Sequence, residues 1–214
     1  MKKELEQVLS DIEKYKIVDE VTLVGVSKTQ PMDLIEKLVT LGVDNLGENR
    51  PQELRDKVDM NIVEAKWHMI GRLQSNKIKY VINRACLIHS VADKKLLSEI
   101  NEAALKNDKV MEVLVQVNTS NEDSKQGLNE NELVEILEYA KELKNTVVVG
   151  LMCMAPLVDD EAIINETFKI AKQWYDKYND NFKYLSMGMS HDYVIALKNG
   201  ANMLRIGSLL FKED

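Results

Sequence analysis

The chain contains 214 residues, of which 45% are hydrophobic and 29% are charged, and this is enough apolar material to bury the core of one domain. Its formal net charge of -7 opposes the phosphate backbone of DNA or RNA, so a nucleic acid is not an expected partner. The longest nearly apolar stretch, Val147 to Val158, contains a glycine and a proline and is shorter than the about 20 residues of a membrane span, so no membrane partner is expected.

The cysteines and the amino-terminal sequence indicate a cellular compartment. Cys86 and Cys153 are too far apart to suggest a disulfide framework or a metal-binding pair. The chain starts with M-K-K-E-L-E-Q, which lacks the apolar segment of a signal peptide. We therefore expect a reduced, cytoplasmic protein, and we expect it to be a monomer.

Helical and extended patterns alternate along the chain. A leading helix is predicted over Lys3–Lys16, and eight short apolar runs predict strands over Val21–Val26, Val43–Gly47, Lys66–Ile70, Leu87–Val91, Val110–Val117, Val147–Met152, Lys183–Met187 and Met203–Ile206. Amphipathic stretches between them predict helices over Asp93–Lys106, Glu130–Leu143, Asp159–Tyr178 and Asp192–Lys198. The alternation favours an α/β fold, a single-domain TIM (β/α)8 barrel over residues 1–214 with an extra N-terminal helix. An open doubly wound sheet fits the same periodicity, which does not separate the two.

A lysine follows the first predicted strand, in the sequence G-V-S-K-T-Q-P. Ligand groups of parallel α/β proteins lie just beyond the carboxyl ends of the strands, which is where Lys28 is placed. One interpretation is a solvated lysine at a strand end. The other is an amine at a barrel mouth, removed from water so that its pKa falls and it can form a Schiff base with an aldehyde.

The second, third and fifth strands also end in polar residues, in N-L-G-E-N-R, W-H-M-I-G-R-L-Q-S-N-K and Q-V-N-T-S-N-E-D-S-K-Q-G. His68 alone fits a hydrogen-bonded core histidine as well as a functional group, and Asn118 could cap a turn. Their position on one rim favours a polar ligand.

The last two strands run into L-S-M-G-M-S-H-D-Y and L-R-I-G-S-L-L-F. In barrel enzymes these two loops commonly hold a phosphate group, and Ser190, Gly207 and Ser208 have suitable chemistry. Ser190 could instead cap the following helix, and Gly207 could be a turn glycine. Arg205 would point toward a ligand or an internal carboxylate. A lysine facing a phosphate site suggests a phosphorylated aldehyde, and pyridoxal 5′-phosphate (PLP) is the obvious candidate.

Several motifs occur together in order: V-S-K-T-Q-P, L-G-E-N-R, H-M-I-G-R-L-Q-S-N-K, V-N-T-S-N-E-D-S-K-Q-G, G-L-M-C-M-A-P, L-S-M-G-M-S-H-D and R-I-G-S. With them the chain resembles the pyridoxal 5′-phosphate homeostasis protein family, whose barrel is similar to the N-terminal domain of alanine racemase. The resemblance implies a Schiff base on Lys28, Asn49 near the ring and Arg205 facing the pyridine nitrogen. It implies phosphate contacts from Ser190, Gly207 and Ser208. It also implies further cofactor-binding or pocket-rim positions at His68, Met187, Asn76, Lys77 and Lys125.

Three functions follow as hypotheses. The first is a PLP-binding carrier or regulator in vitamin B6 homeostasis, without significant turnover, that serves PLP-dependent apo-enzymes. A racemase of this barrel type takes its opposite-face base from a second domain, and the sequence ends seven residues after Gly207. The second hypothesis is a small PLP-dependent amino-acid racemase or lyase. The third is a Schiff-base aldolase without a cofactor.

Overall fold

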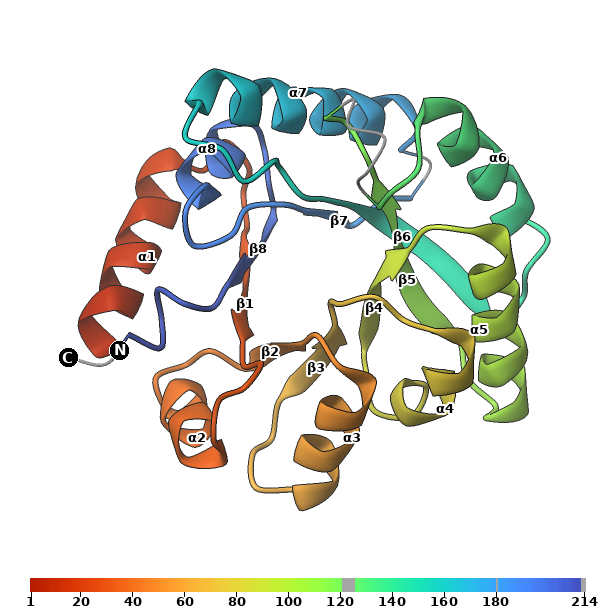
Figure 1. Cartoon of the computed structure of the whole chain (residues 1–214), viewed down its shortest axis with the longest axis horizontal. Helices are drawn as coiled ribbons and strands as arrows, with labels where there is room; N and C mark the ends of the chain where they lie inside the picture. The colour runs from red at the N-terminus through yellow and green to blue at the C-terminus, as the bar shows by residue number, and fades with distance from the viewer. Residues whose placement is uncertain (121–125, 180, 213–214) are drawn as a thin grey trace.

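Eight parallel strands form a closed barrel in this computed structural model, which describes residues 1–120, 126–179 and 181–212 (Figure 1). The strands are β1 (Thr22–Val26), β2 (Asn45–Glu48), β3 (Lys66–Met69), β4 (Leu87–Val91), β5 (Met111–Val117), β6 (Thr146–Cys153), β7 (Tyr184–Ser186) and β8 (Met203–Ile206). Each follows the previous one both in the chain and around the barrel. All eight predicted strands are present at the expected positions, with ends that differ by a residue or two.

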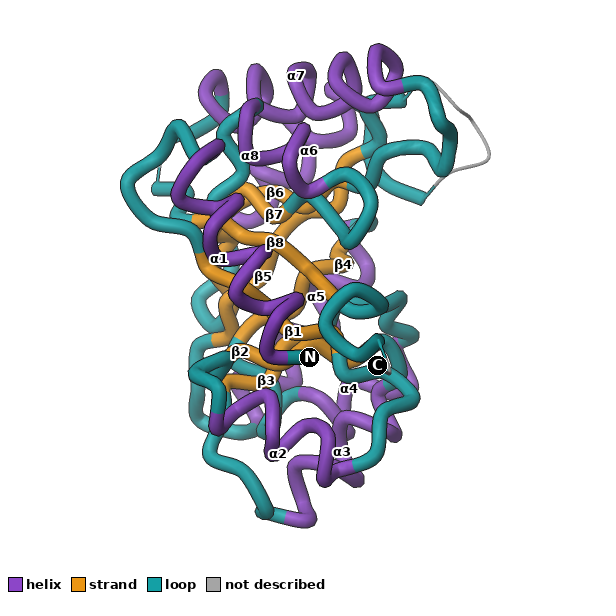
Figure 2. Tube along the Cα trace, turned by 90° about the vertical axis from the view of Figure 1, so that its left-hand side faces the viewer, coloured by secondary structure: helices purple, strands orange, loops and turns teal. Residues whose placement is uncertain are grey.

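Helices surround the barrel, whose strands lie in the centre of the molecule (Figure 2). They are α1 (Lys2–Tyr15), α2 (Met32–Thr40), α3 (Pro51–Met60), the 3-10 helix η1 (Ser75–Lys77), α4 (Ile78–Val81), α5 (Lys94–Lys106), α6 (Glu130–Ala140), α7 (Glu161–Lys177) and α8 (Tyr193–Lys198). No helix within the described ranges combines the length and the apolar character that crossing a bilayer requires.

The barrel closes where β1 pairs with β8. Leu23 lies opposite Leu204, and Gly25 lies opposite Ile206, in parallel register. Every strand therefore has a neighbour on both sides, and no sheet edge is left unpaired. An open doubly wound sheet would have two free edges, so the closure confirms the barrel.

The lumen of the barrel is filled rather than hollow. An apolar cluster separate from the layer between strands and helices contains Val24, Leu87, Leu114, Val149, Met152 and Met203. Because side chains alternate between the two faces of a strand, Arg205 on β8 shares the lumen with Met203. The apolar plug thus supports a polar layer nearer to the carboxyl ends of the strands.

Helix ends follow local hydrogen bonding. The Asp93 side chain accepts a hydrogen bond from the Leu96 N–H group at 2.7 Å, so α5 starts directly after this cap. Helix α6 ends before the predicted Leu143 because the last N–H groups donate to carbonyls only three residues back, including Leu143 N–H to the Ala140 oxygen at 3.1 Å. These bonds form turns instead of a further α-helical turn.

The extra helix α1 packs on the outside of the barrel beside α8, as Figure 1 shows. Its buried face consists of Leu5, Val8 and Ile12, spaced as one stripe of an amphipathic helix. The Tyr193 hydroxyl of α8 donates a hydrogen bond to Asp11 Oδ2 at 2.7 Å. The leading helix therefore supports the segment after β7.

Candidate functional site

A cavity of about 400 Å³ opens at the carboxyl ends of the strands. Six of the eight residues predicted to bind a cofactor line it: Lys28, Asn49, Ser190, Arg205, Gly207 and Ser208. They come from segments at the ends of β1, β2, β7 and β8, so the barrel brings together residues that are far apart in the sequence. Other hollows, between α6 and α7 and between α4 and α5, lie on the outer helices and contain none of these groups.

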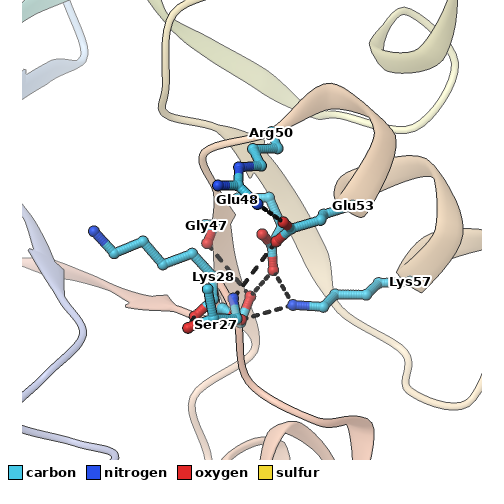
Figure 3. Close-up of polar contacts among 8 residues, drawn as sticks. Ser27, Lys28, Gly47, Glu48, Arg50, Glu53 and Lys57 are labelled. Carbon is cyan, nitrogen blue, oxygen red and sulfur yellow. Dashed lines mark hydrogen bonds and ion pairs between the residues drawn. The ribbon is translucent and has the colours of Figure 1, made fainter.

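Lys28 follows β1 and lies in the mouth of the cavity. Figure 3 shows its side chain extending away from α3, whose Lys57 approaches the same segment from the other side. Lys28 is exposed. The removal of this amine from water that the sequence suggested is therefore not found.

Asn49 is placed by a close approach of two strand ends. A Cβ atom on Gly71, after β3, would lie 2.2 Å from the Asn49 carbonyl oxygen, so only glycine fits there. The Gly71 carbonyl in turn accepts a hydrogen bond from Ser90 Oγ at 2.6 Å. Asn49 is thus held at the rim by backbone packing.

The turns after β7 and β8 meet at Ser190. Its Oγ accepts hydrogen bonds from the N–H groups of Gly207 and Leu209, both at 3.3 Å. Ser208 lies between these two donors and also lines the cavity. Backbone N–H groups and hydroxyls gathered in this way suit a phosphate group.

The turn that carries Ser190 requires a glycine and a buried carboxylate. Gly188 has a φ of +93°, and a Cβ atom there would lie 2.7 Å from the Ala196 Cβ. Asp192 is buried, and its Oδ1 accepts a hydrogen bond from the Met189 N–H group at 2.5 Å. Asp192, not Ser190, precedes α8 as its N-cap residue. The alternative in which Ser190 caps this helix is therefore wrong.

Arg205 is a buried cation at the base of the cavity. Its NH1 group donates to Ser186 Oγ at 2.8 Å and its NH2 group donates to the Cys153 carbonyl oxygen at 3.0 Å. Burial lowers the pKa of Arg205 to about 10, which still leaves the guanidinium protonated at neutral pH. Because it has donors only, it suits an acceptor atom of a ligand.

His68 does not line the cavity but lies one layer deeper, as a hydrogen-bonded core histidine. Its Nδ1 lies 3.0 Å from His89 Nε2, and its Nε2 lies 3.0 Å from Asn45 Oδ1. His89 Nδ1 lies 3.1 Å from Ser186 Oγ, which accepts from Arg205. We call these four hydrogen-bonded side chains, Asn45, His68, His89 and Ser186, the interior relay.

The interior relay has one consistent set of protons. Asn45 donates its amide to Asp44 Oδ1, so its Oδ1 accepts from His68 Nε2–H. Neutral His68 must then accept at Nδ1 from His89 Nε2–H, and His89 Nδ1 accepts from the Ser186 hydroxyl. Burial lowers the pKa of His68 to about 4 and that of His89 well below its usual value, so both rings are neutral at pH 7.

The other predicted positions lie elsewhere. Met187 is fully buried in the layer between strands and helices, because it follows the lumen-facing Ser186 and points to the opposite face. Asn76 lines the hollow between α4 and α5, and Lys77 lies over the Tyr80 ring. Lys125 lies outside the described residues.

Nine lining residues were not singled out from the sequence: Val26, Ile70, Gly71, Arg72, Gln116, Gln126, Met154, Met189 and His191. Most belong to the same strand-end motifs, so the signal was their place directly after a strand. With its amide turned to satisfy both partners, the Gln126 oxygen accepts from Arg72 NH1 at 2.9 Å. This bond links the segments after β3 and β5 across the mouth.

Comparison with known proteins shows the family to which the chain belongs. The model of the alanine racemase N-terminal domain matches residues 5–214. The pyridoxal phosphate homeostasis protein of Aquifex aeolicus (strain VF5) is 40% identical over 196 residues, which cover 89% of this chain and 86% of that protein. The chain belongs to the pyridoxal phosphate homeostasis protein family.

Solved structures place this family member among similar barrels. PipY of Synechococcus elongatus PCC7942, solved with PLP bound, is 28% identical with a TM-score of 0.89, and the match covers 99% of each chain. An alanine racemase of Clostridium difficile 630 is 18% identical with a TM-score of 0.78, and the match covers 99% of this chain but 57% of that one. The second likeness shows a shared fold, as the motif resemblance implied.

The cavity of this family member fits a phosphorylated aldehyde by its donor set. It combines an exposed primary amine, two turns that offer N–H groups and hydroxyls, and a buried guanidinium. Its volume of about 400 Å³ lies in the range that small-molecule sites occupy.

Proposed function

We propose that this chain binds PLP in the cavity and holds it through a covalent bond from Lys28 Nζ to the aldehyde carbon. Ser190, Gly207 and Ser208 would bind the phosphate, and Arg205 would face the pyridine nitrogen. The observation that carries the proposal is the meeting of Lys28, the two turns and Arg205 in one cavity. PLP supplies an aldehyde for imine formation and a ring that accepts electrons.

We further propose a role as a carrier or regulator of PLP in vitamin B6 homeostasis, without significant turnover. Unlike an aspartic acid, the Arg205 guanidinium would not transfer a proton to the pyridine nitrogen of PLP. The ring would then stay unprotonated and accept electrons weakly. Among the described residues, the lining contains no tyrosine, aspartate or glutamate, and its histidine, His191, has its Nε2 3.3 Å from Asp192 Oδ2. PLP-dependent apo-enzymes in the cytoplasm would be the recipients, and the protein would act as a monomer.

Absorption spectroscopy with borohydride reduction tests the proposal. The protein incubated with PLP should show a visible band that borohydride removes, and mass spectrometry should locate the label on Lys28. Lys28→Ala should lose the label but keep weak binding through the phosphate turns. Lys94→Ala, on the outer helix α5, is the matched control and should behave like the unchanged protein.

Three results would contradict the proposed binding or the proposed role. A label on another lysine would show that Lys28 is the wrong amine. A chain that acquires no band with PLP would favour the aldolase hypothesis instead. Racemisation or decarboxylation of amino acids at about 1 s⁻¹ or faster would contradict the carrier role and favour the racemase or lyase.

A further inference from the structure

An ion pair between β2 and α3 lies beside the segment that carries Lys28 (Figure 3). Glu48, at the end of β2, is completely buried, and the side chain of Lys57 from α3 is 11% exposed. Lys57 Nζ lies 2.5 Å from Glu48 Oε1, which also accepts a hydrogen bond from Ser27 Oγ at 2.7 Å. The cation has a second partner, because Lys57 Nζ donates to the Ser27 carbonyl oxygen at 2.7 Å.

The residue after Lys28 has a strained backbone. Thr29 has a φ of +62°, in the left-handed region that β-branched residues rarely enter. Its N–H group donates to Glu53 Oε2 at 3.5 Å, and Arg50 NH1 holds the other oxygen of Glu53 at 2.8 Å. Strain of this kind persists only where the surroundings enforce it, and it clusters at functional sites.

One helix face therefore holds the backbone on both sides of Lys28. Glu53 and Lys57 are four residues apart on α3 and lie on the same face. Lys57 binds the carbonyl before Lys28, and Glu53 binds the N–H group after it. We call these two residues of α3, together with Glu48, the β2 residue that pairs with Lys57, the α3 clamp.

The two lysines at this point differ in their commitments. Lys57 Nζ is tied to a carboxylate and a carbonyl, whereas Lys28 Nζ forms no hydrogen bond or ion pair within the described ranges and faces the cavity. Figure 3 shows the Lys28 side chain extending away from the segment, whereas the Lys57 side chain reaches the segment from α3. A buried ion pair often stabilises a fold less than apolar packing would, and Glu48 Oε2 forms no hydrogen bond with any residue that the structure describes.

We propose that Lys57 is a positioning residue: with Glu53 it holds the left-handed turn at Thr29 and so presents Lys28 Nζ to the PLP aldehyde. The proposal rests on the proposed function of Lys28. In the step it serves, the Lys28 amine attacks the aldehyde carbon, a C=N bond replaces C=O, and the carbonyl oxygen leaves as water with two amine protons. A displaced amine slows this step, and a misplacement of about 1 Å can cost on the order of 100-fold in rate.

The test compares bond formation with phosphate binding. In Lys57→Met, the visible band should form about 10- to 100-fold more slowly with PLP. The affinity for pyridoxamine 5′-phosphate, which has no aldehyde, should stay within about twofold because the phosphate turns are intact. Lys109→Met is the matched control, since Lys109 Nζ also donates to a backbone carbonyl, that of Ile82 at 2.7 Å, away from the cavity.

Two further variants separate positioning from folding. Adding Thr29→Asn to Lys57→Met should recover part of the lost rate, because asparagine enters the left-handed region more readily than threonine. Glu53→Ala, a change at a partly exposed side chain, should slow bond formation less than Lys57→Met does and provides the test if the latter does not fold.

Some outcomes would overturn the proposal. In Lys57→Met, an equal loss of affinity for PLP and for pyridoxamine 5′-phosphate would show a purely structural role. Unchanged band formation in both Lys57→Met and Glu53→Ala would also exclude positioning by the α3 clamp. If the unchanged protein forms no band, or its label lies elsewhere than Lys28, the proposed function fails instead.

Discussion

Two cations of this barrel, the largely buried Lys57 and the buried Arg205, have different partners. Lys57 Nζ meets the Glu48 carboxylate at 2.5 Å between β2 and α3. Among the described residues, Arg205 donates hydrogen bonds to two neutral groups, Ser186 Oγ at 2.8 Å and the Cys153 carbonyl oxygen at 3.0 Å. In the part of the chain that the structure describes, no carboxylate lies within ion-pair distance of Arg205.

The difference separates scaffold from binding surface. Lys57 is paired with a carboxylate within the fold. Its charge therefore attracts a ligand only weakly. Arg205 keeps its charge at neutral pH and faces the cavity without a direct ion pair among the described residues, although buried Asp192 acts on it electrostatically. An electron-rich ligand group therefore gains more from Arg205 than from Lys57.

Removing the Glu48 carboxylate, which pairs with Lys57, should have the largest effect. Glu48→Ala leaves Lys57 buried without a counter-ion, and we expect the free energy of unfolding to fall by about 3 to 5 kcal/mol. Urea denaturation measures this. Glu135→Ala breaks the exposed pair with Lys94 and should cost at most about 1 kcal/mol. Equal losses in the two variants would show that Glu48 compensates nothing of importance.

Acidification tests the neutral partners beneath Arg205. The pKa of His68 is about 4 in the fold against about 6.5 in the unfolded chain. Between these values the unfolded chain binds more protons, so His68 alone should lower the free energy of unfolding by about 2 kcal/mol from pH 7 to pH 5. The lowered pKa of His89 acts in the same direction. Burial raises the pKa of Glu48 and of Asp192, which acts in the opposite direction.

A variant isolates the histidine contribution from that of the carboxyls. Glutamine does not titrate in this pH range. In His68→Gln, the free energy of unfolding measured by urea denaturation should therefore decrease less between pH 7 and pH 5 than it does in the unchanged protein. An identical pH dependence in both proteins would contradict the neutral state assigned to the interior relay.

Ser190→Ala sharpens the comparison on the ligand side. Loss of one hydroxyl at the turns should weaken pyridoxamine 5′-phosphate binding about tenfold, the effect of one hydrogen bond to a charged group. Calorimetric titration measures the affinity. Thr40→Ala, which removes a hydroxyl on the outer helix α2, should leave the affinity unchanged. A similar loss in both would place the phosphate elsewhere.

Ser186→Ala should have the smallest effect. It removes one neutral partner of Arg205 and breaks the interior relay, while the charge and the phosphate turns remain. We expect a shift of the visible band of the PLP-loaded protein with less than about a twofold change in affinity. Lack of any shift would place the guanidinium away from the ring.

The fold and most of the site could be predicted because their signals are local. Apolar runs mark the strands, and residues directly after them, such as Lys28 and Ser190, reach the rim whatever the details of packing. His68 was misplaced because the sequence shows its strand but not its depth in the lumen. Its partner His89 comes from another strand, so pairing the two rings required the barrel register.

The α3 clamp had no signal in the sequence at all. Glu48 and Lys57 belong to different elements, and only packing of α3 on β2 brings their side chains together. The left-handed backbone of Thr29 could not be predicted either, because threonine rarely adopts this conformation. Met187 lies outside the cavity lining for a simpler reason, because strand alternation turns it away from the lumen that Ser186 faces.

The pairing of β1 with β8 also has a consequence for how the protein assembles. Lys28 follows the first strand of the barrel and Arg205 lies on the last, and the two meet only through the register of Val24 with Arg205. During synthesis the lysine leaves the ribosome long before its counterpart. The cavity is therefore completed late, when the last strand pairs with the first. Until then, the nascent chain contains Lys28 but not the cavity in which Lys28 faces Arg205.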